Sequence, residues 1–167
     1  EGVTAAVTGS DDEAVAAAVL ARMRNHGKTL ATAESLTGGL ICAALTAVSG
    51  ASEVVRGGIV AYGLQAKVVI LGLPGDELRS HGVYSAWTAE AMAYGARIAL
   101  SADYAVSCTG VAGPGDDEGV PAGTVYIAVA SPDAVRSQAC HFTGGRDAVR
   151  AATVSEALHL LSATFTS

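Results

Sequence analysis

Helical and strand-like patterns alternate along this chain, and that alternation limits the fold more than any other feature of the sequence. Helices are expected at about 10–24, 40–48, 65–71, 87–100 and 146–163, and strands at about 29–31, 59–62, 103–108, 124–130 and 136–142. The exception to the alternation is the last pair of strands, which a short Ser131-Pro132-Asp133 turn joins directly. Alternation with one such hairpin predicts an α/β fold, a three-layer α/β/α sandwich with a mixed sheet.

The length of 167 residues suits one domain with a hydrophobic core of its own. No internal repeat, low-complexity tract or domain boundary is visible. Residues 1–10 are small and polar, and we expect them to be a flexible N-terminal segment, with 11–167 as the single domain. The chain begins with Glu1, which leaves open a preceding domain of a longer protein.

The charge pattern disfavours nucleic acid as a partner, because the net charge is −6 and no block of Lys or Arg occurs. No apolar run has the length of a membrane span, and the N-terminus has no basic-then-apolar signal. The three cysteines form no C-x-x-C pair, and the four histidines show no ligand spacing. We therefore expect reduced thiols, no metal, no membrane contact and a cytoplasmic location.

The stretch from Thr29 to Leu40 (TLATAESLTGGL) passes from a strand through a Gly-rich turn into a helix. Free N–H groups at a helix start attract anions, and Gly38 and Gly39 would let a ligand approach the backbone closely. A simpler interpretation is a tight connection in which Ser35 or Thr37 is an N-cap. The residues of this stretch alone do not decide between the two.

A second Gly-rich loop, TGVAGPG, runs from Thr109 to Gly115 after the strand at 103–108. Ligands of open α/β sheets collect at such strand ends. The loop is not a dinucleotide motif, because Pro114 and the acidic residues after it do not start a helix. The P-loop and G-x-S-x-G motifs are also absent.

Three further side chains are candidates for chemistry. Ser52 lies in a Gly-Ala-Ser turn, and Tyr62 and Lys67 lie around the end of a short strand. A buried lysine has a lowered pKa and can act as a base toward a serine. Spacing alone favours simpler interpretations, in which Lys67 reaches solvent from an amphipathic helix and Ser52 caps the next segment.

The motifs together resemble one family. TAESLTGG, then GAS followed by GGIVAY and a lysine, then CTGVAGPG followed by PAGTVYIAV are similar to the C-terminal domain of the competence-damage-inducible protein CinA. The resemblance extends from about Asp11 to Leu161. It implies a three-layer α/β/α fold and a nicotinamide-nucleotide amidase, which converts nicotinamide mononucleotide to nicotinic acid mononucleotide and ammonia without a metal or cofactor.

The resemblance also implies roles for individual residues. Ser52 matches the expected nucleophile and Lys67 its base, with Tyr62 and Ser35 as supporting groups. We expect one Gly-rich loop to hold the oxyanion and the other, with an arginine, to hold the 5′-phosphate. The expected substrate-binding residues are Thr37, Gly38, Gly39, Thr109, Gly110, Gly113, Gly115 and Arg146.

Departures from the family pattern leave a second function open. Ser49 replaces a proline, Gly63-Leu64 replaces Ser-Asn, and Gly145 replaces an aspartate before Arg146. The alternative is a catalytically silent nucleotide-binding or regulatory domain of a CinA-type protein. The Ala-rich and Leu-rich faces of the last two helices favour a homo-oligomer, although the same faces could simply cover the sheet.

Overall fold

The computed structural model describes residues 9–166, so the expected flexible segment at 1–10 lies outside the described residues apart from Gly9 and Ser10. Ser10 already belongs to the first helix. In chain order the elements are α1 (Ser10–Asn25), β1 (Leu30–Glu34), α2 (Leu40–Thr46), the 3-10 turn η1 (Ala51–Glu53), β2 (Val55–Val60), α3 (Leu64–Val69), α4 (Gly75–His81), α5 (Ala86–Ala99), β3 (Tyr104–Gly110), β4 (Thr124–Ala130), β5 (Val135–His141) and α6 (Arg146–Thr164).

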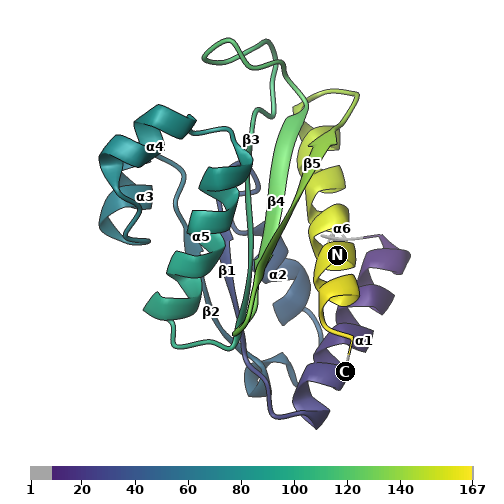
Figure 1. Cartoon of the computed structure of the whole chain (residues 1–167). Helices are drawn as coiled ribbons and strands as arrows, with labels where there is room; N and C mark the ends of the chain where they lie inside the picture. Colours follow the sequence, from purple (N-terminus) through teal and green to yellow (C-terminus); the bar gives the residue numbers. More distant parts are fainter. Residues whose placement is uncertain (1–8, 167) are drawn as a thin grey trace, which may run out of the picture.

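The five strands form one mixed sheet in the order β2-β1-β3-β4-β5. β2, β1 and β3 are parallel, whereas β4 is antiparallel to β3 and β5 is antiparallel to β4. Helices α1, α2 and α6 cover one face, and α3, α4 and α5 lie on the other (Figure 1). The predicted three-layer α/β sandwich with a mixed sheet is confirmed.

The two faces of the sheet carry side chains of different size. In β4, Val125, Ile127 and Val129 belong to the core under α1, α2 and α6, whereas the alternate residues Ala128 and Ala130 meet α5. Successive side chains of a strand point to opposite faces, so one strand supplies both cores. The alanines let α5 pack close to the sheet, because its own inward residues include Ala89 and Ala93.

Strand β2 begins earlier than the predicted start at 59, so that Gly57 and Gly58 lie inside it. Gly57 pairs with Ala31 and Gly58 with Thr32 of β1. A Cβ on Gly58 would lie 2.5 Å from the Thr32 hydroxyl and 2.9 Å from the Cys42 sulfur. Glycine is therefore present because α2 packs tightly on the strand. The expected strand at 59–62 is wrong at its end, since β2 stops at Val60 and Tyr62 follows in a loop.

Candidate functional site

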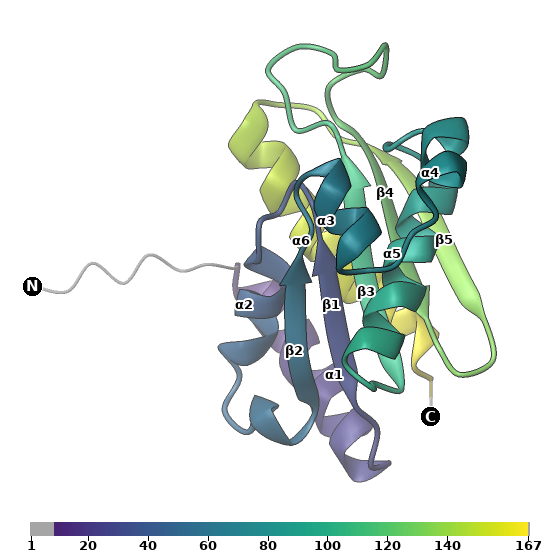
Figure 2. The same ribbon diagram turned by 90° about the vertical axis from the view of Figure 1, so that its left-hand side faces the viewer.

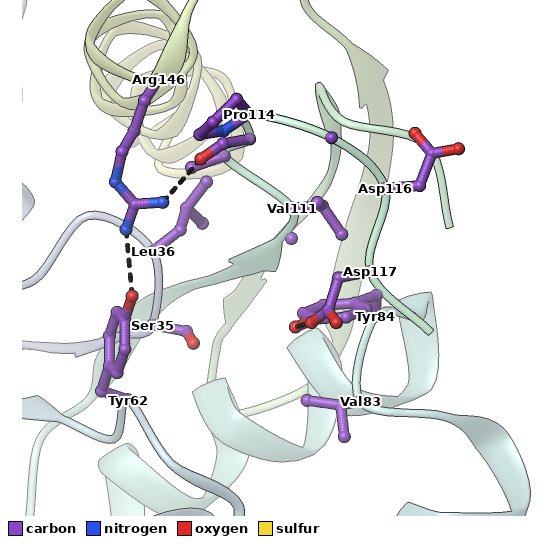
Figure 3. Close-up of a pocket in the computed structure, with 14 residues that line it drawn as sticks. Ser35, Leu36, Tyr62, Val83, Tyr84, Val111, Pro114, Asp116, Asp117 and Arg146 are labelled. Carbon is purple, nitrogen blue, oxygen red and sulfur yellow. Dashed lines mark hydrogen bonds between the residues drawn. The ribbon is translucent and has the colours of Figure 1, made fainter. Parts of the chain in front are cut away.

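A pocket of about 390 Å³ opens at the edge of the sheet where the parallel strands end. Ser35 and Leu36 follow β1, Tyr62 follows β2, and Gly110 ends β3 and leads into the loop at 111–117. Val83 and Tyr84 before α5 and Arg146 at the start of α6 complete the lining (Figure 3). The pocket therefore forms at the carboxyl ends of parallel strands, where open α/β sheets bind ligands.

Ser35 and Lys67 form a hydrogen-bonded pair at this pocket. The Lys67 ammonium is 3.0 Å from the Ser35 hydroxyl oxygen, 2.7 Å from the Ala61 carbonyl and 3.2 Å from the Tyr62 carbonyl. Lys67 is 0% exposed, although it lies on the short helix α3. The three oxygens match the three donors of an ammonium group. The interpretation in which Lys67 reaches solvent is therefore wrong.

Burial lowers the pKa of Lys67 from its ordinary value to about 8. The ion pairs found among residues 9–166 do not include Lys67. A lysine without a carboxylate partner loses its proton more easily, because no ion pair offsets the loss of solvent around the charged form. Near neutral pH a useful fraction of the Lys67 amine is thus free to accept a proton from the Ser35 hydroxyl.

Ser52 lies far from this pair. It is exposed in η1, before β2 begins, whereas Lys67 binds the carbonyls that follow the end of β2. The six residues of β2 separate the two ends by roughly 20 Å at about 3.3 Å per residue. Ser52 lines a different hollow with Cys42, Thr46 and Ser49. The expected pairing of Ser52 with Lys67 is therefore wrong, and Ser35 takes that place.

The turn that carries Ser35 is fixed by a buried carboxylate that the sequence analysis missed. Glu34 is 1% exposed. Its oxygens accept from the backbone N–H groups of Ile41 (2.8 Å) and Cys42 (2.9 Å) and from the Thr37 hydroxyl (2.6 Å). Gly39, the N-cap of α2, has no side chain to do this. In the sequence, the available signal for this capping role was an acidic residue at the end of a strand, just before the Gly-Gly start of a helix.

The expected binding residues of the first loop do not line the pocket. Thr37 is buried and donates to Glu34, and Gly38 and Gly39 lie outside the lining. Arg150 of α6 braces the turn from outside, with Nε 3.0 Å from the Leu36 carbonyl. The first Gly-rich turn therefore holds Ser35 in place, and the glycines of the pocket lining come from the second loop.

The second loop and Arg146 meet at the pocket. The Arg146 guanidinium donates to the Gly113 carbonyl at 2.8 Å and to the Tyr62 hydroxyl at 3.0 Å (Figure 3). Gly110 and Gly115 also line the pocket. Thr109 is buried below them, and its hydroxyl donates to the Val83 carbonyl at 2.8 Å. A guanidinium held at a pocket wall is suited to bind a phosphate or carboxylate.

The remaining wall contains Tyr84 and Asp117, which the sequence analysis did not single out. The Tyr84 hydroxyl donates to the Asp117 carboxylate. Burial, and next this hydrogen bond, raise the pKa of Tyr84, so its hydroxyl stays protonated and neutral. No motif marks this contact, because Asp117 lies on a loop that returns to Tyr84 only in the folded chain.

The departures from the family pattern lie outside the pocket lining. Leu64 begins α3 and is partly exposed, and Gly145 is the N-cap of α6. Within residues 9–166 no group of three or more His, Cys, Asp or Glu side chains could hold a metal ion. In the same part of the chain, no helix combines the length and apolar character needed to cross a membrane.

Comparison with known proteins gives consistent matches. The family model described as the CinA C-terminal domain matches residues 12–165. A CinA-like protein of Myxococcus xanthus is 48% identical over 155 residues, which cover 92% of this chain and 37% of that protein. A CinA-like protein of Synechococcus sp. is 44% identical over 156 residues, which cover 92% of this chain and 37% of that protein. The chain thus spans little more than a third of the length of these relatives.

Solved structures match over nearly the whole chain. The competence/damage inducible protein CihA from Agrobacterium tumefaciens has a TM-score of 0.89 and 38% identity, with 93% of this chain and 96% of that chain covered. A competence-damaged protein (CinA) superfamily protein from Escherichia coli has a TM-score of 0.88 and 33% identity, with 93% and 92% covered. The sequence matches and the structural matches both confirm the resemblance to the CinA C-terminal domain.

Proposed function

Because this chain belongs to the CinA C-terminal domain family, we propose that it is an amidase of nicotinamide mononucleotide with Ser35 as nucleophile and Lys67 as base. The observation that carries the proposal is the 3.0 Å contact between Lys67 Nζ and the Ser35 hydroxyl at the pocket. The lowered pKa of Lys67, to about 8, supports its role as a base. The family, which includes such amidases, indicates the substrate class.

The proposed reaction has two steps. Neutral Lys67 accepts the Ser35 proton while the serine oxygen attacks the carboxamide carbon. The tetrahedral intermediate collapses as Lys67 returns the proton to the leaving ammonia, and water then hydrolyses the acyl-serine to the carboxylate. Leu36 lines the pocket next to Ser35, and we assign its backbone N–H to the oxyanion.

Arg146 is the proposed binding group for the 5′-phosphate. Its guanidinium lies on the pocket wall and bonds only neutral oxygens among the described residues, those of Gly113 and Tyr62. Its charge is therefore available to an anion. This assignment gives the phosphate to the second Gly-rich loop and leaves the reaction centre to the first turn.

The test measures ammonia release from nicotinamide mononucleotide. Ser35→Ala and Lys67→Met should each lower kcat by about a thousandfold or more, because each removes a partner of the proton transfer. Ser52→Ala is the matched control: it removes the same hydroxyl outside the pocket and should retain the activity of the unmodified chain.

Three outcomes would contradict parts of the proposal. Loss of activity in Ser52→Ala with retention in Ser35→Ala would restore Ser52 as nucleophile. Binding of the nucleotide without ammonia release would favour the silent regulatory domain. Neither binding nor release would remove nicotinamide mononucleotide as substrate.

A further inference from the structure

Two walls of the pocket carry opposite charges. Arg146 and Tyr62 form one wall, and Tyr84 and Asp117 form the other (Figure 3). Ser35 lies at the same pocket, on the turn after β1. A ligand that reaches Ser35 is therefore exposed to a guanidinium and to a carboxylate at once.

The two charges do not neutralise each other. The ion pairs found among residues 9–166 include neither Arg146 nor Asp117. The recorded side-chain partner of Asp117 is the Tyr84 hydroxyl, a neutral donor. Each wall thus keeps its charge for a ligand, and a ligand with one positive and one negative group complements the pocket better than a purely anionic one.

The negative wall is anchored to the sheet. The Thr109 hydroxyl at the end of β3 donates to the Val83 carbonyl, which fixes the segment that leads into Tyr84. On the loop that carries Asp117, the carboxylate of the neighbouring Asp116 accepts from the Ala122 N–H at 3.1 Å. Asp117 is therefore held at the Tyr84 hydroxyl by both the loop and the hydrogen bond.

We propose that Tyr84 and Asp117 are specificity-determining residues that select a positively charged aromatic ring, a pyridinium, over a neutral ring of the same shape. This inference rests on the proposed function. An aromatic face attracts a cation through its quadrupole, and a carboxylate beside it strengthens the attraction. The phosphate of the same nucleotide would bind Arg146, so the ligand's two charges would match the two walls.

The test compares nicotinamide mononucleotide with its reduced form, which has the same ribose, phosphate and carboxamide but an uncharged dihydropyridine ring. Binding is measured by calorimetry at pH 8 in the Ser35→Ala background, so that no turnover occurs. That protein should bind the oxidised nucleotide about tenfold more tightly. Asp117→Asn should remove most of this preference by weakening the oxidised nucleotide alone, and Tyr84→Phe should reduce it in part.

Glu118→Gln is the matched control, because it removes the same charge from the same loop at a residue that does not line the pocket. It should leave both affinities unchanged. An equal loss of affinity for both nucleotides in Asp117→Asn would overturn the inference and indicate that Asp117 contacts the ribose. Unchanged affinities in Asp117→Asn, or an equal loss of preference in Glu118→Gln, would overturn it as well.

The two proposals fail in distinguishable ways. If the unmodified chain releases ammonia from the nucleotide but Asp117→Asn keeps the full preference, the amidase assignment stands and the specificity inference is wrong. If the chain neither binds nor hydrolyses the nucleotide, both are wrong. Thermal melting of each variant checks that the exposed loop substitution has not unfolded the protein.

Discussion

Lys67 illustrates how position changes the chemistry of a single side chain. It lies on the short helix α3, and a lysine on a helix at the protein surface ordinarily extends to water. Here its ammonium points inward to two carbonyls and to Ser35. The loss of solvent is what lowers its pKa, so the same contacts that bury the group also prepare it as a base.

The pH dependence of ammonia release follows from this. The base must be neutral, so kcat/KM should rise about tenfold per pH unit below pH 8 and level off above the Lys67 pKa of about 8. The measurement is kcat/KM for ammonia release between pH 6 and 10, with circular dichroism as the control for folding. A profile that is flat through pH 8 would contradict the role of Lys67.

The lowered pKa of Lys67 also affects stability, because the unfolded chain keeps the lysine proton at pH values where the folded chain releases it. Between about 8 and the ordinary value of 10.5, the unfolded lysine is protonated while the folded one is neutral. The contribution of Lys67 to the free energy of unfolding should therefore rise with pH across this window. Comparison of the unmodified chain with Lys67→Met by urea denaturation at pH 8 and pH 10 measures the difference.

Helix α2 depends on a residue outside itself. Its N-cap is Gly39 in the left-handed region, with φ 106°, which a side chain would strain. The carboxylate of Glu34 supplies the cap from the end of β1 and so ties the strand, the turn and the helix together. Because Ser35 is the next residue, the cap of α2 also fixes the proposed nucleophile.

Glu34→Ala should therefore lower both stability and activity. It leaves the buried Ile41 N–H, the half-buried Cys42 N–H and the Thr37 hydroxyl without this acceptor, which should cost about 2 kcal/mol of unfolding free energy. Urea denaturation measures this cost, and kcat for ammonia release should fall in protein that is still folded. Glu53→Ala, an exposed acid in a loose 3.7 Å ion pair with Arg24, is the control and should change stability by less than about 0.5 kcal/mol. Equal stability of the two variants would contradict the capping role.

The whole molecule has its larger core on the α1–α2–α6 side and its site at one end of the sheet. Phe165, after α6, closes that core at the other end, where its ring meets Tyr104 edge-to-face at 5.3 Å. Arg22 of α1 donates to the Phe165 carbonyl at 2.8 Å. Phe165 is thus packed into the core beyond the end of α6, whereas Arg146, at the opposite end of this helix (Figure 2), lines the pocket.

This separation predicts a variant that loses stability and keeps its site. Phe165→Ala should lower the unfolding free energy by about 3 kcal/mol, because it removes a buried ring and leaves a cavity. The KM for nicotinamide mononucleotide should stay unchanged at a temperature where the variant is folded. Ala163→Ser, at an exposed position in the last turn of α6, is the control and should match the unmodified chain in both measurements. A raised KM in Phe165→Ala would show that the two ends are coupled.

The sequence by itself determined the layer architecture and the family, because periodicity and turn residues are local properties. It also marked the second Gly-rich loop, which lines the pocket. It could not determine which serine meets Lys67. Gly57 and Gly58 resemble a turn in sequence, yet they lie within β2, where the close approach of α2 requires glycine at position 58. Only the tertiary structure extends the strand through these glycines, and that strand places Ser52 and Lys67 at opposite ends of the sheet. The parallel pairing of β1 with β2 then brings Ser35 to the lysine, because it aligns the carboxyl ends of the two strands.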